Sequence, residues 1–358
     1  LYSVLPADGV GDFNFSRNSA ATRINKDGLI ETVAVGKSRL NYPLIDGVVN
    51  GCPSHLLEPS RSNLLSYSED FSQSYWLKTS GVGLVGGQLS PDGTNNAYKF
   101  TANSNNAVMY KQFSGSTNTN YNNSIYAKRV VGNGDVILKS VQYNDLVIPL
   151  TTEWQRFNIS DLTTSDILTF QIGLATLGDE ILIYGAQIEQ GSYATSYIPN
   201  YGTSAGITRV AETANGAGDA STFNDSEGVL MAEISALAND GTNRQISISN
   251  GTNAQRIYFG FSANTNEFIL SSRDSSYIQG TISDVLNFNK YAFQYKTGNF
   301  KAFINGFNYN LTLDGGLLPT GLDRLNFDDS LGNADFYGNT KQIQYFDSAL
   351  NDSDLETI

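Results

Sequence analysis

The chain consists of short runs of aromatic and β-branched residues, separated by polar turns that are rich in Gly, Asn and Ser. Helix-favouring runs of Ala, Leu, Glu and Lys are nearly absent. Aromatic and β-branched residues favour strands on a half-buried pleated sheet, and the turn residues favour tight connections between those strands. The pattern therefore predicts an all-β fold. With 358 residues, the chain is long enough for two β-sandwich or jelly-roll domains.

Turn signals divide the chain into three regions. Residues 1–63 form a hairpin-rich segment with too little apolar mass to fold alone. We expect this segment to pack against the second region, a neighbouring subunit or another protein. Residues 64–200 carry regularly spaced strand-like runs that predict a jelly roll, and residues 201–358 predict a second sandwich.

Four local patterns give sharper expectations. In "ILIYGAQI" (181–188) the even-numbered side chains are all apolar or aromatic, which predicts a strand with that side facing the core. The small, polar, Gly-rich stretch "NYGTSAGITRVAETANGAG" predicts a linker between the sandwiches. Asn305-Gly306 lies between two strand-like runs and predicts a type I′ hairpin. Asn351 or Asp352 is a candidate N-cap for a short helix over 352–357.

The charge balance limits the partners. Formal net charge is −13 with 16% charged residues, so a phosphate backbone or an anionic membrane surface would be repelled. No apolar run reaches the length that spans a bilayer. We therefore predict no nucleic-acid partner and no membrane insertion, whereas glycans and proteins remain open as partners. The chain opens at Leu1 and not at Met, so we expect it to be a fragment of its gene product.

The residues available for chemistry are few. Cys52 and His55 are the only cysteine and histidine, which rules out an intramolecular disulfide and a Cys/His zinc set. We expect Cys52 to be a buried small side chain, and His55 to be structural or solvent-facing. No catalytic residue is predicted. A glycosidase needs only two carboxylates, and 35 acidic residues make a chance pair easy, so glycan cleavage stays open as an alternative.

Oxygen-rich loops raise the question of calcium, which prefers such ligands. The simpler interpretation is that they are solvated hairpin turns, and we predict no metal and no cofactor. The loops are Asn239–Asn243, Ser90–Asn96 and Phe327–Asp335.

Aromatic side chains beside amide side chains are the feature most suited to a ligand. Sugar rings present C–H faces that stack on aromatic rings, and their hydroxyl groups need polar partners. The predicted ligand is a neutral or weakly charged glycan. The candidate residues are Tyr75, Trp76, Tyr110 and Gln112 in the second region, and Tyr258, Arg273 and Tyr277 in the third.

Three segments resemble recurrent parts of bacteriophage tail, fibre and virion structural proteins. They read "FSRNSAATRINKDGLIETV", "RLNYPLIDGVVNGCPSHLLEPSRSNLLSYSEDFSQSYWLK" and "YGAQIEQGSYATSYIPNYGTSAGITRVAE". The resemblance implies a carbohydrate-binding-module-like jelly roll over residues 64–200. The pieces "YAFQYKTGNFKAFINGFNYN" and "LNFDDSLGNADFYGNTKQIQYFDSALNDSDLETI" resemble a concanavalin A-like (laminin G-like) domain.

The resemblance implies a virion protein on the tail or capsid surface, as a tail fibre, spike or head decoration. Its partners would be other virion proteins and, as an adhesin, a host cell-surface glycan. By analogy with fibres we expect a homo-oligomer, with a trimer preferred. A purely structural decoration protein and, less favoured, a glycan depolymerase are the alternatives, because the fold alone does not decide between them.

Overall fold

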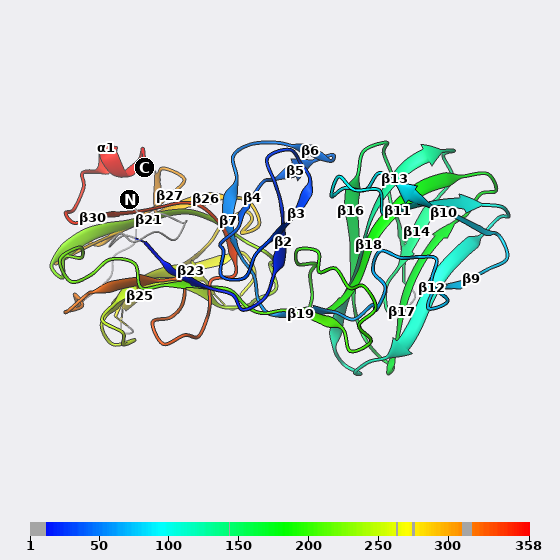
Figure 1. Cartoon of the computed structure of the whole chain (residues 1–358). Helices are drawn as coiled ribbons and strands as arrows, with labels where there is room; N and C mark the ends of the chain where they lie inside the picture. Colours follow the sequence, from blue (N-terminus) through cyan, green and yellow to red (C-terminus); the bar gives the residue numbers. More distant parts are fainter. Residues whose placement is uncertain (1–11, 143, 263, 274–275, 310–316) are drawn as a thin grey trace.

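The computed structural model describes residues 12–142, 144–262, 264–273, 276–309 and 317–358, with the backbone alone for residues 276–278. Within these ranges nearly all regular structure is strand, and the helix α1 (Asp352–Leu355) is a single turn. Two β-sandwiches form the ends of an elongated molecule, and N-terminal strands lie between them (Figure 1). The predicted all-β fold with two sandwich domains is confirmed.

The middle sandwich consists of two five-stranded antiparallel sheets, with strand orders β10-β11-β18-β13-β16 and β15-β14-β17-β12-β9. Alternating side chains from both sheets, such as Phe100, Ile125 and Phe170, fill one core between them. The strands are β9 (Leu77–Lys78), β10 (Val82–Gln88), β11 (Ala97–Ala102), β12 (Ala107–Ser114), β13 (Asn120–Val131), β14 (Val136–Lys139), β15 (Asp145–Val147), β16 (Gln155–Leu162), β17 (Ile167–Leu174) and β18 (Glu180–Gln190).

The C-terminal sandwich packs a seven-stranded sheet, β28-β27-β26-β21-β30-β7-β4, against a five-stranded sheet, β25-β24-β23-β22-β29. Its core contains Leu230, Phe259, Phe268 and Phe293. The strands that follow the middle sandwich are β21 (Glu227–Ala236), β22 (Arg244–Ser249), β23 (Arg256–Phe261), β24 (Glu267–Ser272), β25 (Ser276–Thr281), β26 (Asn289–Lys296), β27 (Lys301–Ile304), β28 (Phe307–Asn308), β29 (Arg324–Asn326) and β30 (Gly338–Phe346).

The N-terminal segment joins both sandwiches. Its β7 pairs with β30 and with β4, so two N-terminal strands extend the seven-stranded C-terminal sheet. We expected contact with the second region or with another chain; main-chain pairing with the third region was not anticipated. The strands are β1 (Asn14–Ser16), β2 (Ala21–Ile24), β3 (Ile30–Val33), β4 (Leu40–Asn41), β5 (Leu44–Ile45), β6 (Val48–Val49), β7 (Ser54–Leu57) and β8 (Arg61–Asn63).

The stretch predicted to be an inter-domain linker lies between the strands of the two sandwiches and is an ordered part of the fold. β19 (Ile207–Arg209) pairs with β8, and β20 (Thr213–Asn215) pairs with β1. Arg209 and Glu212 are each 1% exposed. Small, Gly-rich composition is shared by linkers and by tightly packed strands, and the two charged residues were the sign of burial against a partner.

The prediction for β18 is correct for only half of the strand. Ile181 and Ile183 contact the core of the middle sandwich, as do Ala186 and Ile188, whereas Tyr184 packs on the opposite face. The change of face occurs at Gly185, whose φ of 64° lies in the left-handed region, where the pairing with β13 shifts register. A β-bulge of this kind inserts one residue and reverses the alternation.

The two local turn predictions are confirmed. Asn305 and Gly306 have φ values of 52° and 80°, as a type I′ turn between β27 and β28 requires. The Asn351 side chain accepts a hydrogen bond from the Asp354 N–H at 3.0 Å and caps α1. Within the described ranges no helix is long and apolar enough to cross a bilayer.

Candidate functional site

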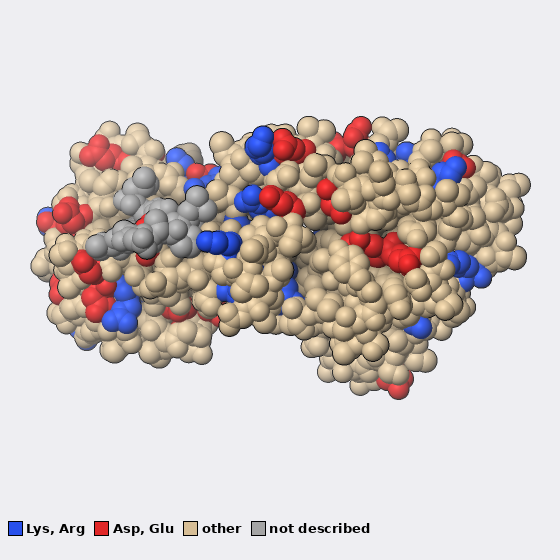
Figure 2. Space-filling view, viewed as in Figure 1, with Lys and Arg blue, Asp and Glu red and all other residues tan. Residues whose placement is uncertain are grey.

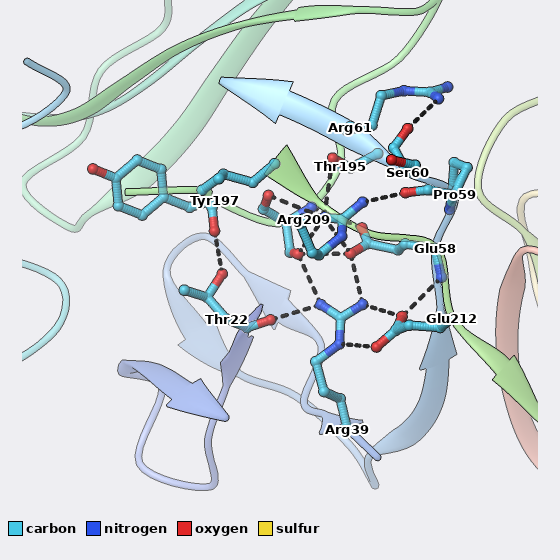
Figure 3. Close-up of polar contacts among 12 residues, drawn as sticks. Thr22, Arg39, Glu58, Pro59, Ser60, Arg61, Thr195, Tyr197, Arg209 and Glu212 are labelled. Carbon is cyan, nitrogen blue, oxygen red and sulfur yellow. Dashed lines mark hydrogen bonds and ion pairs between the residues drawn. The ribbon is translucent and has the colours of Figure 1, made fainter. Parts of the chain in front are cut away.

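Buried charges meet where the three regions of the chain join (Figure 3). Arg17, Arg39 and Arg209 face Glu58 and Glu212, and the five side chains are at most 3% exposed. We call these five residues the junction network. Arg17 and Arg39 come from the N-terminal segment, Glu58 follows β7, and Arg209 and Glu212 lie in the stretch between the sandwiches.

Glu212 is the centre of the junction network. Its Oε1 accepts hydrogen bonds from Arg17 at 2.6 Å and from Arg39 Nε at 2.9 Å. Its Oε2 accepts from the Glu58 N–H at 2.9 Å and from a terminal nitrogen, Nη2, on the same guanidinium edge of Arg39. Forked binding of this kind is the strongest arrangement of an arginine and a carboxylate.

Glu58 joins Arg39 and Arg209, each at 2.8 Å from its Oε2. Burial alone would raise the pKa of Glu58, but Arg209, Arg39 and hydrogen bonds from Ser196 outweigh it and lower this pKa to about 2. The carboxylate is therefore charged at all physiological pH values. The Arg39 pKa is raised, because Glu58 and Glu212 outweigh the effect of its burial.

The junction network accounts for much of the motif-like sequence at the start of the chain and after β18. Each of the three segments that read as motifs contributes to it: Arg17 belongs to the first, Arg39 and Glu58 to the second, and Arg209 and Glu212 to the third. Its side chains are closed off from solvent and bonded to one another. The network can therefore fix the regions against one another, but it offers no surface to a ligand.

A solvent-accessible cleft of about 550 Å³ lies on the middle sandwich. Tyr67, Tyr98 and Tyr201 line it together with four amide side chains and two carboxylates, and we call it the tyrosine cleft. Tyr201 is 74% exposed, so a face of its ring is open to solvent. The other lining side chains are those of Glu69, Asp70, Gln73, Asn95, Asn96 and Asn200.

Two segments far apart in sequence form the cleft because their backbones pair. Tyr67 and Tyr201 form an isolated antiparallel bridge, and the Ser68 N–H donates to the Asn200 carbonyl at 3.0 Å. The Gly202 N–H donates to the Ser66 carbonyl at 2.6 Å. This pairing places the exposed Tyr201 ring beside the loop that follows β8.

Glu69 accepts hydrogen bonds from tyrosines beside the cleft and from one amide that lines it. Its Oε1 accepts hydrogen bonds from the hydroxyls of Tyr184 and Tyr197 at 3.0 and 2.9 Å, and its Oε2 accepts from Asn96 at 2.6 Å. Tyr201 also hydrogen-bonds to Glu69, and burial and the nearby carboxylate raise the pKa of Tyr201 to about 12. Burial, the largest effect, raises the pKa of Glu69 above its usual value.

Asp70 fixes one tyrosine and one glutamine at another part of the cleft wall. It accepts hydrogen bonds from the Tyr98 hydroxyl at 2.7 Å and from Gln73 at 2.6 Å. Burial opposes its ionisation, but the bonds from Gln73, Ser72 and Tyr98 lower its pKa to about 2. The cleft is thus lined by pre-oriented rings and amides, with anionic groups behind them.

The carboxylates of the cleft are poorly placed for acid–base catalysis. The Tyr184 hydroxyl lies between Glu69 Oε1 and Asp92 Oδ2, at 3.0 and 3.1 Å. Both oxygens of Glu69 are occupied by neighbouring donors, and Asp92 Oδ1 accepts from Thr94 at 2.9 Å. A general acid must reach the leaving-group oxygen directly, so this arrangement suits fixing side chains more than proton transfer.

Tyr75 and Trp76 lie behind the cleft and do not line it. Trp76 is 2% exposed, and its indole N–H donates to the Tyr67 carbonyl at 3.0 Å. The half-buried Tyr75 ring packs against Tyr67 at 5.6 Å, and the Lys111 ammonium covers it at 4.3 Å. The prediction that Trp76 offers a stacking surface to a sugar is therefore wrong. Both residues instead contact Tyr67 from the side away from the cleft.

Tyr110 and Gln112 lie on the outer face of β12, in the sheet that does not form the tyrosine cleft. Tyr110 is half-buried opposite Leu77 and Gln171. Gln112 is exposed, and its amide donates to Thr169 at 3.3 Å. They remain candidates for an open sheet face, separate from the cleft.

The structure shows the side-chain placement of two of the three candidates in the C-terminal sandwich, Tyr258 and Arg273. Tyr258 is 6% exposed beneath the Arg256 guanidinium, which lies 4.2 Å from its ring centre and donates to the Asp329 carbonyl. Tyr258 is therefore covered, and its assignment to a sugar site is wrong. Arg273 lies in a turn and donates to the Ala254 carbonyl at 3.1 Å. The side chain of Tyr277 lies outside the described part of the structure.

Sequence reasoning missed Tyr201, Tyr67 and Tyr98. Tyr201 was assigned to the linker, although "PNYG" places an aromatic ring in a turn where it cannot be buried in a strand. That signal could have identified it. Tyr67 and Tyr98 could not be found in the same way, because their placement depends on the long-range pairing of residue 67 with residue 201.

Cys52 is exposed, contrary to the prediction that it is buried. The described residues contain no group of three or more His, Cys, Asp or Glu placed to bind a metal. The acidic side chains of the oxygen-rich loops close their own turns. Asp92 accepts from the Thr94 N–H at 2.9 Å, and Asp329 accepts from the N–H groups of Leu331 and Asn333, both at 2.9 Å.

No protein-family model and no curated protein sequence matches the chain. The solved structures that it matches include carbohydrate-binding modules. One is described as "CBM4 structure and function" (12% identity, 35% of this chain and 84% of that chain, TM-score 0.25). Another is the CBM22-1 xylan-binding domain from Paenibacillus barcinonensis Xyn10C (12% identity, 37% of this chain and 94% of that chain, TM-score 0.29). The CBM22-1-CBM22-2 tandem domain of the same protein matches over 81% of this chain and 99% of that chain, at 11% identity and a TM-score of 0.30.

Proposed function

We propose that this chain is a non-enzymatic virion structural protein of a bacteriophage, which binds a neutral glycan of the host surface in the tyrosine cleft. The observation that carries the glycan-binding part is the 74% exposed ring of Tyr201, fixed above a cleft of amides and carboxylates. Aromatic rings take the C–H face of a sugar, and fixed amides and carboxylates take its hydroxyl groups. The virion part rests on the resemblance of the three N-terminal and middle segments to tail and fibre proteins.

The carboxylates restrict the ligand. Glu69 and Asp70 line the cleft, and no Lys or Arg is among its lining residues. An acidic sugar would meet uncompensated negative charge there, so a neutral sugar is favoured. The face of the molecule in Figure 2 is mostly uncharged, which suits a neutral polar partner.

The experiment compares two exposed aromatic residues. Neutral oligosaccharides from host-surface polysaccharides are titrated into the wild-type protein and into Tyr201→Ala and Phe307→Ala. We expect Tyr201→Ala to weaken binding about fivefold, because ring stacking contributes about 1 kcal/mol. Phe307 is 76% exposed in the β27–β28 turn, far from the cleft, so its variant should bind normally. Equal loss in the two variants, or no binding of neutral glycans, contradicts the proposal.

A purely structural decoration protein is the second candidate. It is favoured by the junction network, which uses residues from all three phage-like segments for fixing the regions together. In this case the chain would assemble with other virion proteins as a homo-oligomer, for which a trimer is preferred. Failure of every neutral glycan to bind, with the chain located in the particle, would select it.

A further inference from the structure

A second cavity, of about 690 Å³, lies on the middle sandwich and has a basic group in its wall. We infer that it binds the anionic substituent, a carboxylate or a phosphate, of an acidic sugar. We call it the Arg61 pocket, after its one charged lining residue. Its polar lining includes Ser60, Ser62, Ser114, Gln190 and Ser204.

Arg61 retains hydrogen-bonding capacity for a ligand. One terminal nitrogen donates to the Ser60 carbonyl at 3.0 Å, and among the described residues no other acceptor of an Arg61 hydrogen bond is found. The fully buried Glu189 forms a long ion pair with Arg61, at 4.0 Å between its Oε2 and Arg61 Nε, and this oxygen already accepts from the Thr195 hydroxyl at 2.5 Å. Its Oε1 accepts from Gln187 and from the Thr195 N–H, both at 2.8 Å. A guanidinium has five N–H donors in a planar fork that matches a carboxylate or a phosphate.

The surrounding structure fixes the position of the guanidinium. Arg61 lies over the Tyr193 ring, 5.5 Å from its centre. Gly191 has a φ of 145°, and a Cβ there would lie 2.8 Å from Arg61 Nε, so glycine leaves the space that the guanidinium occupies. Pre-orientation of this kind reduces the entropy lost on binding.

Arg61 differs from the arginines of the junction network. Arg39 and Arg209 are buried and paired with glutamates, whereas the Arg61 side chain is 20% exposed. Figure 3 shows Arg61 pointing away from the cluster around Glu58 and Glu212. Its role is therefore separable from that of the junction.

The other walls of the pocket suit a sugar that carries the anion. Serine hydroxyls can donate to its oxygens, and Phe113 and Leu64 supply an apolar edge for the ring. The net charge of −13 repels a polyanion at long range, but one local cation can still accept a single anionic substituent. This inference does not depend on the tyrosine cleft, which favours uncharged sugars.

The test uses glucuronic acid and glucose 6-phosphate as probes, with glucose as the neutral match, titrated into the full chain. The titrations are repeated with Tyr201→Ala, in which the tyrosine cleft has lost its exposed ring. In this variant we expect one or both anionic probes to bind and glucose not to bind, with affinity that falls as salt is added. Binding of glucuronic acid alone identifies a carboxylate ligand, and binding of glucose 6-phosphate alone identifies a phosphate ligand. Absence of binding by both anionic probes, or equal binding of glucose to Tyr201→Ala, overturns the inference.

Three variants locate the binding. Arg61→Gln should lower the affinity for the anionic probes at least tenfold. Tyr201→Ala, in the tyrosine cleft, should leave this affinity unchanged. Should Arg61→Gln fail to fold, Ser204→Trp fills the pocket from an exposed turn and should abolish binding. Retained binding in a folded Arg61→Gln or in Ser204→Trp overturns the inference.

Discussion

At the scale of single residues, Glu212 is the buried carboxylate that pairs with both Arg17 and Arg39. Glu212→Gln leaves three buried arginines opposite the one carboxylate of Glu58. Breaking a buried ion pair by removing one partner costs about 3–5 kcal/mol, because the remaining charge stays uncompensated. We therefore expect the free energy of unfolding in a denaturant titration to fall by this amount.

The matched control for Glu212 is the exposed pair of Arg23 and Glu31, whose side chains are 28% and 44% exposed. Glu31→Gln removes the same charge from a solvated surface, where a pair contributes about 0–1 kcal/mol. Similar losses of unfolding free energy in Glu31→Gln and Glu212→Gln would show that the junction network does not stabilise the fold.

His55 makes stability depend on pH. It is buried between Phe15 and Phe327, and neither ring nitrogen has a hydrogen-bond partner among the described residues. Burial, followed by repulsion from Arg39, lowers the His55 pKa from 6.5 to about 4. Between these values the unfolded chain binds the proton more tightly, so stability falls as the pH drops from 6.5 to 4, by about 3 kcal/mol at most.

The His55 contribution can be isolated with His55→Leu, which has a similar volume and no titrating group. Unfolding free energies of the wild type and the variant are compared between pH 7 and pH 4. The difference between them should change by a few kcal/mol across this window in favour of the variant. A constant difference would mean that His55 is not buried in its neutral form.

At the scale of secondary-structure elements, the bulge in β18 connects the core of the middle sandwich with the face behind the tyrosine cleft. A Cβ at Gly185 would lie 3.2 Å from the Tyr197 ring and 3.3 Å from the Tyr126 ring. Gly87 has a similar positive φ of 76°, but no atom within 4 Å. An alanine in this backbone region costs about 1–2 kcal/mol at either position. Thermal unfolding should show a greater loss of stability for Gly185→Ala than for Gly87→Ala. Equal losses of stability would contradict a bulge that is packed against Tyr197 and Tyr126.

The same bulge shows how far sequence could predict this fold. Alternation, turn residues and the Asn305-Gly306 pair predicted strands and a hairpin, because these depend on near neighbours. The face of Tyr184 could not be predicted, because Gly185 reverses the alternation and the bulge depends on pairing with β13. The tyrosine cleft was likewise hidden, since Tyr67 and Tyr201 meet only through the folded chain.

At the scale of the whole molecule, the two sandwiches are joined through ordered, paired strands and not through a flexible tether (Figure 1). Trypsin tests this directly. Lys37 is exposed in a turn, whereas Arg39 and Arg209 are at most 1% exposed. Cleavage after Lys37 should precede cleavage after Arg39 or Arg209, because a protease needs an accessible, locally unfolded segment. Early cleavage after Arg209 would show that the stretch between the sandwiches is flexible and not held by its pairing with β8.

The central claim is that the tyrosine cleft of the middle sandwich holds a neutral glycan. Hydrogen exchange of the full chain, with and without a neutral host oligosaccharide, tests it most directly. We predict slower exchange in segments 67–73, 95–98 and 200–202, which line the cleft, and no change in the β27–β28 hairpin. Absence of protection at saturating oligosaccharide, or protection confined to the C-terminal sandwich, would contradict the claim.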